Sequence, residues 1–288
     1  MILPDVPMGH YVRDTFPGDT VSLSSSIAHR LLTRSPLHAW TAHPRLNPAW
    51  EPDDARAFDL GTAAHGVLLE GRSLFTVDFP DYRTKQAQAI RDTAKEAGQL
   101  PVLAHQAAAI REMVMIARLA LANCPDLAGL LGCEHIETTI LWTEGAAHLR
   151  CRPDMMTAGH EVIVSYKTTQ ANAEPNAFLR ILLGSGYDVQ AAFELAAVKA
   201  AVGKDARYVW LVQECEPPYA CSLLGMSPML YDLAHRKYLR AAALWSECMA
   251  SGRWPAYPER ICYLDPPAWS VTQFAEAHMY ADNTVEAL

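Results

Sequence analysis

The chain has 288 residues, half of them hydrophobic and 19% charged, and its 24 basic and 32 acidic residues give a formal net charge of −8. This composition excludes a disordered or low-complexity protein, because the apolar side chains can offset the conformational entropy that folding costs. The acidic balance argues against a protein that coats nucleic acid without specificity, although basic residues can still gather in one cleft.

No segment predicts a membrane anchor or a secretory leader. The most apolar run, residues 113–122, contains Arg118 and is much shorter than the roughly 20 apolar residues that span a bilayer. The first residues lack a basic region followed by an apolar core. Seven scattered cysteines without a CxxC pair indicate reduced thiols. We therefore expect a cytoplasmic protein that does not enter the membrane.

The first half of the chain predicts helices over 24–33, 60–70, 82–98 and 103–123. The second of these ends before Gly71, and the third is polar and carries several basic residues. In the fourth, which Pro101 is expected to open, apolar residues recur every three or four positions from Ile110 to Leu121. This spacing is typical of a helix that packs one face inward. Residues 1–130 are therefore expected to be mainly helical.

The pattern changes near residue 136, where β-branched and aromatic residues become frequent. Strands are expected over 136–143, 147–152, 161–169 and 207–214, with a turn at Glu144-Gly145. Helices are expected over 172–182, 187–201 and 227–251, followed by a proline-rich loop over 254–269. This order predicts an α/β fold with a central mixed sheet flanked by helices. Without a visible repeat or linker, we expect one domain over 1–288: the helical part, a core (131–270) and a tail (271–288).

Three residues of the second half suggest a chemistry: Asp154 in RPD (152–154), and Ser165 and Lys167 in SYK (165–167). Side chains of a strand alternate between its faces, so Ser165 and Lys167 share one face and Tyr166 points to the other. Asp154 follows the preceding strand and reaches that face if the two strands pair. An Asp and a Lys placed in this way suit metal-assisted phosphodiester hydrolysis. The carboxylate holds Mg²⁺ against the phosphate, and the lysine orients water and offsets developing charge.

A PD pair, a spacer and a (D/E)-x-K triplet form the signature of the PD-(D/E)XK nuclease superfamily, which this chain resembles. It resembles most the RecE-like group, the exodeoxyribonuclease VIII type of phage recombination exonuclease. The segments that carry the resemblance follow the family order: LGTAAHGVLLEG (60–71), 81–99, RCRPDMM (150–156), VIVSYKTT (162–169), GYDVQAAFEL (186–195) and 254–269. It implies a restriction-endonuclease-like core and a metal-dependent 5′→3′ exodeoxyribonuclease acting on linear double-stranded DNA.

The resemblance also implies roles for single residues. Asp154 and His65 are expected to bind Mg²⁺, or Mn²⁺ in its place, together with the backbone carbonyl of Tyr166. Glu137 occupies the family's first-strand Glu position and is a further candidate ligand. Lys167 is expected to be the catalytic lysine. On the residues alone, His65 would instead be a buried core histidine and Glu137 a solvated strand residue.

Ser165 departs from the family pattern, which has an acid at this position. A hydroxyl is a poor Mg²⁺ ligand beside a carboxylate, so the site lacks one negative charge. Three explanations stay open. The chain binds DNA but no longer cuts it, or the serine is an engineered inactivating change. Alternatively, the acid has moved to Glu194, which lies one helical turn after Gln190, a residue that the resemblance places near the active site.

Basic residues that could hold the DNA backbone lie in two predicted helical regions: Arg30 and Arg34, and Arg83, Lys85, Arg91 and Lys95. The resemblance implies a homo-oligomeric ring that acts on double-stranded DNA ends, a single-strand annealing protein as partner, and the cytoplasm of a bacterial host cell. Two other functions stay open. One is a catalytically silent DNA-end binder or scaffold for the annealing protein, and the other is a nuclease for single strands or flaps.

Overall fold

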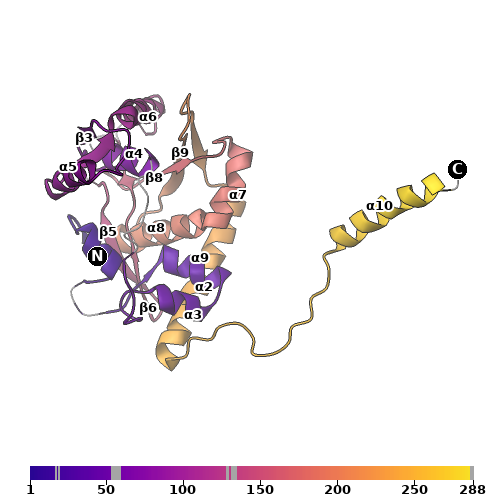
Figure 1. Cartoon of the computed structure of the whole chain (residues 1–288). Coiled ribbons are helices and arrows are strands. Elements are labelled where there is room, and N and C mark those ends of the chain that lie inside the picture. Colours follow the sequence, from indigo (N-terminus) through magenta and orange to yellow (C-terminus); the bar gives the residue numbers. More distant parts are fainter. Residues whose placement is uncertain (17, 19, 53–59, 128–129, 131–134, 286–288) are drawn as a thin grey trace. The chain divides into compact units, whose positions relative to one another are not determined.

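The computed structural model describes residues 1–16, 18, 20–52, 60–127, 130 and 135–285 (Figure 1). The chain divides into two compact units, residues 1–255 and 256–288. Three parts of the sequence predictions lie outside the described residues: Cys133, residue 131 at the start of the expected core, and residues 286–288 at the end of the expected tail. None of the described helices combines the length and the apolar composition that crossing a membrane requires.

Among the described residues of the first unit, the strands form two mixed four-stranded sheets and one parallel pair. The first sheet has the order β1-β5-β6-β2 and the second the order β10-β9-β8-β7, while β3 pairs with β4. Within the second sheet β8 and β9 run parallel, and the other pairs are antiparallel. The strand bounds are β1 (Ile2–Leu3), β2 (Leu23–Ser24), β3 (Leu74–Val77), β4 (Leu100–Leu103), β5 (Thr139–Glu144), β6 (Ala147–Cys151), β7 (Met155–Met156), β8 (Val162–Thr169), β9 (Arg207–Glu214) and β10 (Cys221–Gly225).

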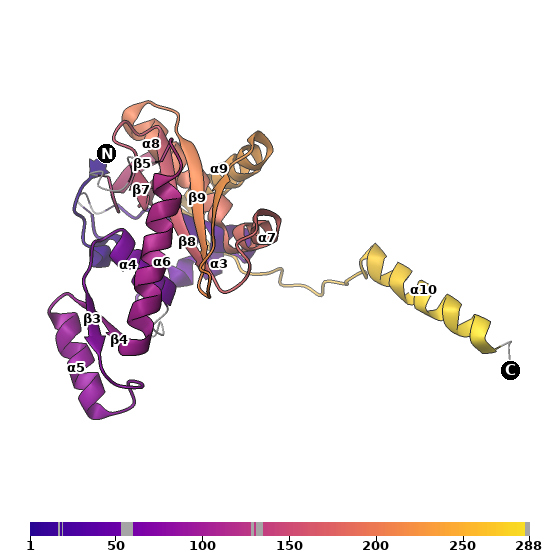
Figure 2. The same cartoon turned by 90° about the horizontal axis from the view of Figure 1, so that it is seen from above.

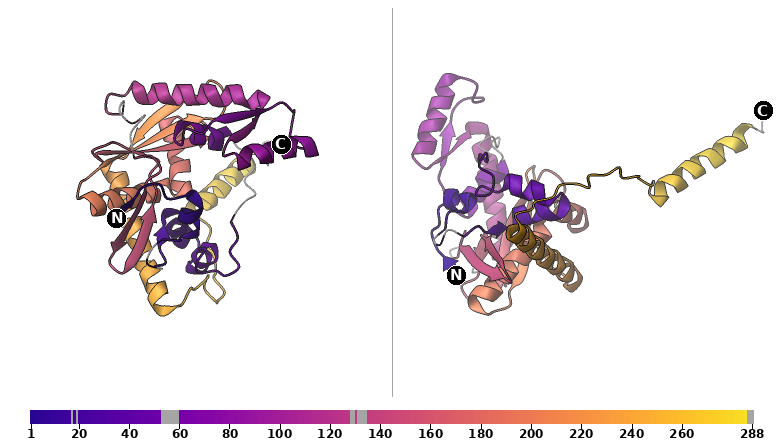
Figure 3. Two further views of the ribbon diagram at one scale, coloured as in Figure 1. Left: turned by 90° about the vertical axis from the view of Figure 1, so that its left-hand side faces the viewer. Right: turned by 90° about the horizontal axis from the view of Figure 1, so that it is seen from below.

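Helices accompany these sheets, which confirms the expected α/β class. In the left view of Figure 3 the magenta helix α6 runs along the top of the unit, and the orange helix α9 lies toward the bottom. The helix bounds in the first unit are α1 (Met8–Arg13), α2 (Ser25–Thr33), α3 (Pro36–Ala42), α4 (Leu60–Leu68), α5 (Lys85–Glu96), α6 (Ala104–Ala122), α7 (Pro175–Ser185), α8 (Tyr187–Val202) and α9 (Pro228–Ser251). The second unit holds α10 (Ala268–Val285).

Most expected elements are confirmed within a few residues, whereas the helices α1, α3 and α10 were not predicted. The strands β1, β2, β7 and β10 and the pair β3–β4 were not predicted, because runs of two to five residues show too little alternation. Pro101 lies in the two-stranded sheet instead of opening a helix, a position that an edge strand tolerates. The strand expected from residue 136 begins only at Thr139. Glu137 instead adopts a left-handed backbone conformation with φ of 50°.

The strand β8 lies between two hydrophobic clusters because its side chains alternate. Ile163 packs in the cluster that contains Phe193 of α8, whereas Val164 and Tyr166 pack in the cluster that contains Met113 of α6. Figure 2 shows α6 on one side of β8 and β9, with α7 and α9 on the other. Ser165 and Lys167 continue the side of Ile163, so the predicted chemical face of β8 is the one that α8 covers.

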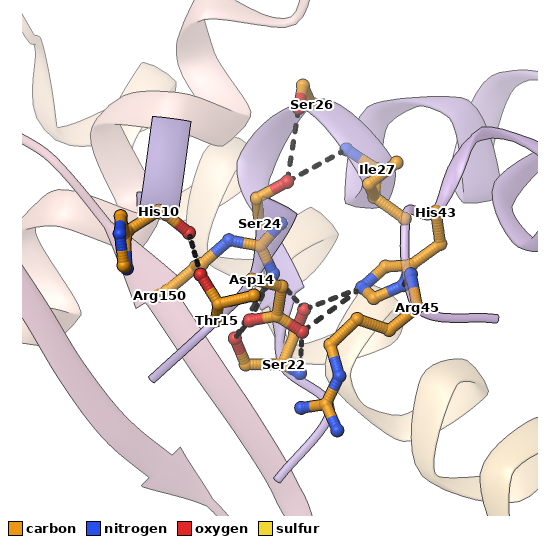
Figure 4. A network of polar contacts seen from close by, with 10 residues as sticks. All are labelled: His10, Asp14, Thr15, Ser22, Ser24, Ser26, Ile27, His43, Arg45 and Arg150. Atoms are coloured by element: carbon orange, nitrogen blue, oxygen red, sulfur yellow. Dashed lines mark hydrogen bonds and ion pairs between the residues drawn. The ribbon is translucent and has the colours of Figure 1, made fainter. Parts of the chain in front are cut away.

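A buried polar network joins the N-terminal segments to β6 (Figure 4). Asp14 accepts hydrogen bonds from the Ser22 backbone N–H at 2.8 Å and from the Ser22 hydroxyl, and it pairs with Arg150 at 3.0 Å. His43 Nε2 lies 3.0 Å from the Ser22 carbonyl oxygen and 3.6 Å from Asp14 Oδ2. Asp14 and His43 are fully buried. The network fixes the segment that leads into β2 and α2, where the Ser24 hydroxyl caps the helix.

We expect His43 to make the protein acid-sensitive. Burial lowers the pKa of His43 from 6.5 to about 4, against the opposing effects of the Ser22 carbonyl and Asp14. Between these pH values the unfolded chain binds a proton at this residue and the folded chain does not. The free energy of unfolding should therefore be unaffected above pH 7 and fall by up to about 3 kcal/mol as the pH drops from 6.5 to 4.

The measurement is the urea unfolding midpoint of the wild type and of His43→Gln at several pH values. The variant should lose this part of the pH dependence, whatever its stability at pH 7. Parallel curves for the two proteins between pH 6.5 and 4 would show that the acid sensitivity arises elsewhere.

Candidate active site

Asp154 reaches the chemical face of β8 from the turn between β6 and β7. Its Oδ2 accepts a hydrogen bond from the Ser165 hydroxyl at 2.9 Å and another from the Tyr166 backbone N–H at 2.8 Å. The Asp154 side chain is 9% exposed. RPD and SYK come together as predicted, but not through the expected pairing of their strands: β6 lies in the first sheet, and β7, which follows Asp154 directly, pairs with β8 instead. Ser165 holds Asp154 from the position where the family pattern has a second acid.

His65, Glu137 and Asp154 converge at this point. His65 Nε2, on α4, lies 3.6 Å from Glu137 Oε1 and 3.8 Å from Asp154 Oδ1. One ligand atom of each residue lies within 4.8 Å of the other two, and within the described part of the chain no other such group of three is found. An imidazole nitrogen and two carboxylate oxygens form a donor set that suits a divalent cation such as Mn²⁺ or Mg²⁺.

Arg152, which was not predicted as a site residue, orients the carboxylate of Glu137 toward His65. Arg152 donates from Nε to Glu137 Oε2 at 2.6 Å and from its guanidinium to the Val6 carbonyl at 2.6 Å. The Glu137 backbone N–H donates to the Asp154 carbonyl at 3.0 Å, which ties the left-handed residue to the turn. Glu137 Oε1 is thereby directed at His65. The sequence feature that could have pointed to Arg152 is its position directly before the PD pair, where a basic side chain can bind the nearby carboxylates.

Glycine at position 61 lets α4, which carries His65, approach β8. Gly61 is buried, and a Cβ atom built on it would overlap the side chain of Thr168 on β8. We expect Gly61→Ala to displace the start of α4 and to destabilise the protein by about 1–3 kcal/mol. The matched control is Gly9→Ala on α1, where nothing lies within 4 Å of the added atom. Equal thermal unfolding temperatures for the two variants would contradict the close approach.

The electrostatics of the group stabilise a positive charge, either a proton on His65 or a cation that replaces it. Although burial opposes it, the positive charge of Lys167 and the contacts with His65 and Ser165 lower the pKa of Asp154 to about 2. Burial and the negative charge of Asp154 raise the pKa of Glu137. The pKa of His65 is raised despite its burial, because Asp154 and Glu137 stabilise the imidazolium. Two carboxylates thus share one small volume, where a divalent ion would relieve their repulsion.

Gln190 and Glu194 lie on the same face of α8, as their spacing predicted. Gln190 Nε2 donates to Glu194 Oε1 at 2.8 Å, and the Tyr208 hydroxyl donates to Glu194 Oε2 at 2.9 Å. Tyr208 also interacts with Ser165. Burial, and next the charge of Asp154, raise the pKa of Glu194 to about 8. Glu194 is therefore linked to Ser165 through Tyr208, but it is not one of the three converging ligands.

Lys167 and Tyr166 point to opposite sides of β8, as predicted. The Lys167 ammonium lies 4.9 Å from the ring centroid of Tyr187, at the start of α8. The Tyr166 hydroxyl donates to Gln213 Oε1 at 2.5 Å in the other cluster. The role of the Tyr166 carbonyl as a metal ligand stays a prediction.

The six cations selected for DNA contact lie in two places in the fold. Arg30 is on α2 and Arg34 is its C-terminal cap, whereas Lys85, Arg91 and Lys95 lie on α5 just after Arg83. Arg83 pairs with Asp81 at 3.5 Å and Arg91 with Asp92 at 2.8 Å. All but Arg91 are exposed. Their contact with DNA stays a prediction.

The fold and the family match define the class of this protein: a PDDEXK-like domain with a restriction-endonuclease-like fold. The family model described as PDDEXK-like domain of unknown function (DUF3799) matches residues 25–267, and the chain belongs to this family. No curated protein matches the chain significantly.

Solved structures that are similar to the chain include two that are named exonucleases. A "Putative exonuclease" from Eubacterium rectale aligns with a TM-score of 0.58 at 11% identity, covering 94% of this chain and 98% of its own. A phage related exonuclease from Haemophilus somnus 129PT aligns with a TM-score of 0.34 at 10% identity, covering 83% and 98%. The first supports the restriction-endonuclease-like fold, and the second similarity is too weak to add to it.

Proposed function

We propose that this protein is a metal-dependent 5′→3′ exodeoxyribonuclease that degrades linear double-stranded DNA. The observation that supports this most is the convergence of His65, Glu137 and Asp154 beside Lys167, on the frame of a PD-(D/E)XK fold. The exonuclease named in the Eubacterium rectale structure favours action from DNA ends.

His65, Glu137 and Asp154 would hold the metal, with the Tyr166 carbonyl as a further ligand. The donor set fits Mg²⁺ or Mn²⁺ because it combines two carboxylates with one imidazole. When bound, such an ion polarises a phosphoryl oxygen and lowers the pKa of a coordinated water molecule. In this assignment Glu137 supplies the second carboxylate that position 165 lacks, and Ser165 orients Asp154 through its hydrogen bond.

The remaining residues would act on the water and the phosphate. The Lys167 ammonium orients the attacking water and offsets the negative charge that develops on the phosphate. Gln190, held by its hydrogen bond to Glu194, would offer its amide to the water or the phosphate. Glu194 is then a positioning residue, and it stays the alternative candidate for the displaced acid.

Substrate and partners follow from the same proposal. Arg30, Arg34 and the cations of α5 would hold the DNA backbone without reading sequence. A homo-oligomeric ring around the duplex would keep an acidic protein on DNA, and a single-strand annealing protein would take the 3′ tail. The place of action would be the cytoplasm of a bacterial host cell.

A catalytically silent DNA-end-binding protein is the second candidate function. It is favoured by one observation, the serine at position 165 in the place of the family acid. This candidate predicts affinity for duplex ends without turnover in any divalent metal.

Digestion of a 5′-phosphorylated linear duplex in Mg²⁺ and in Mn²⁺ tests the proposal, with circular duplex as the control. Release of nucleotides from the 5′ ends of the linear DNA alone is the expected result. Digestion by Ser165→Asp but not by the wild type would establish the silent alternative. Cleavage of circular DNA, or only of flaps and single strands, would overturn the assignment as a duplex exonuclease.

A further inference from the structure

The ammonium group of Lys167 is held by an aromatic ring. It lies 4.9 Å from the ring centroid of Tyr187, the first residue of α8. In the described part of the chain, neither a hydrogen bond nor an ion pair is found for this ammonium group. Three other lysines are instead held by carboxylates: Lys199 by Asp205 at 2.8 Å, Lys204 by Glu161 at 3.8 Å and Lys237 by Asp188 at 2.6 Å.

An aromatic face suits an ammonium group that acts on water and phosphate. The face attracts a cation that lies within about 6 Å of the ring centroid. It does not neutralise the charge, so the N–H donors of the ammonium group can still bind a water molecule or a phosphate oxygen. The lysine stem is flexible, and without such a contact the charge would be spread over many rotamers. The ring therefore restricts the position of the charge and leaves it available.

The ring of Tyr187 is itself held in place. It stacks with the fully buried ring of Phe178 on α7, at a centroid distance of 6.3 Å and an interplanar angle of 17°. The preceding Gly186 has a φ of 74°, and a Cβ atom at this position would overlap a histidine side chain of α2. The following Asp188 is buried and pairs with Lys237 of α9 at 2.6 Å. Packing and charge therefore fix the turn on both sides of Tyr187.

The hydroxyl of Tyr187 is not part of this arrangement. Within the described residues no hydrogen bond is found for it, whereas the hydroxyls of Tyr166, Tyr208 and Tyr238 each donate one to an oxygen atom. The aromatic face is therefore the part of Tyr187 that acts on Lys167, and a phenylalanine should be able to replace it.

We infer that Tyr187 is a positioning residue, whose ring holds the Lys167 ammonium group at the chemical face of β8. Its effect on DNA digestion passes through Lys167 and rests on the proposed function, in which this lysine orients the attacking water. The placement of the ammonium group over the ring does not depend on any activity. The placement and its consequence are therefore measured separately.

Nuclear magnetic resonance of the full chain, with carbon-13 in its six lysines, reports the placement. The ring current of an aromatic face shifts the ε-methylene protons of a lysine stacked on it to lower ppm. The Lys167 signal, identified by its loss in Lys167→Met, should be shifted in the wild type and in Tyr187→Phe. In Tyr187→Leu it should rejoin the signals of the unstacked lysines. An unshifted Lys167 signal in the wild type would overturn the inference, whatever the activity.

Digestion of linear duplex DNA by the same variants reports the consequence. Tyr187→Leu should lower kcat about tenfold and change KM for DNA by less than about twofold, because the ring acts on Lys167 and not on DNA binding. Tyr187→Phe should keep at least about half of the wild-type kcat. The matched control is Tyr231→Leu, which removes a ring that stacks with His235 on α9 at 5.7 Å, and it should digest DNA like the wild type.

Two kinetic results would also overturn the inference. One is a kcat of Tyr187→Phe as low as that of Tyr187→Leu, while both variants retain the circular dichroism spectrum and melting temperature of the wild type. The other is an equal kcat in Tyr187→Leu and the wild type. If the wild type digests no DNA in Mg²⁺ or Mn²⁺, the proposed function fails, and the position of the Lys167 signal alone decides whether Tyr187 holds this lysine.

Discussion

Asp154→Asn is expected to abolish metal-dependent digestion of DNA, with a loss in rate of at least about a thousandfold. The substitution removes one of the two carboxylates that face His65, while the amide keeps an acceptor for the Tyr166 N–H. Folding should survive. The pKa of Asp154 is lowered from 3.8 to about 2, so replacing the ionised carboxylate by a neutral group costs roughly 2–3 kcal/mol at neutral pH. The measurement is nucleotide release from linear duplex, with Mn²⁺ binding followed by calorimetry on the same protein.

The control for Asp154→Asn is Asp126→Asn, which removes an exposed acid that pairs with Arg207 at 3.0 Å, and is not one of the three converging ligands. It should digest DNA like the wild type. Retention of Mn²⁺ binding and of digestion in Asp154→Asn would place the metal elsewhere and refute the site.

Glu137→Gln and Glu194→Gln are expected to differ sharply in metal binding. Glu137 presents a free carboxylate oxygen to His65, so its amide should weaken Mn²⁺ binding at least about tenfold. Glu194 has both oxygens in hydrogen bonds and a pKa of about 8, so it is mostly protonated at pH 7. An amide closely imitates this neutral acid. Glu194→Gln should therefore change Mn²⁺ affinity by less than about threefold and affect only the rate, through Gln190.

The opposite order of Mn²⁺ affinity in these two variants would identify Glu194, and not Glu137, as the metal ligand. If Glu194→Gln loses Mn²⁺ and Glu137→Gln retains it, the acid missing at position 165 has moved to α8, and metal binding must ionise Glu194. Gln190→Ala separates the two roles of the helix, because it removes the amide and leaves both carboxylates. A fall in rate without a change in Mn²⁺ affinity is expected for this variant.

The replacement of the family acid by Ser165 makes chemical sense in this environment. Ser165 is fully buried next to Asp154 and Tyr208, and Tyr208 connects it to Glu194. A third carboxylate at this point would be desolvated between two other acids, at a cost of several kcal/mol unless a cation compensates it. A neutral hydroxyl that donates to Asp154 avoids this repulsion.

Local rules in the sequence determined the parts of the site that depend on periodicity. The alternation of a strand placed Ser165 and Lys167 on one face and Tyr166 on the other, and the structure agrees. The four-residue spacing on a helix predicted the contact between Gln190 and Glu194. Both results need only the geometry of one element, which the order of residues encodes directly.

Only the tertiary structure decided which carboxylates share a volume. Glu137 joins His65 and Asp154 because a left-handed residue outside any strand is held by Arg152, and because Gly61 lets α4 approach β8 closely. The raised pKa of Glu194 likewise follows from its burial beside Asp154. These features depend on contacts between segments far apart in the chain, and the energy of such contacts comes from packing and desolvation, which no local pattern of residues records.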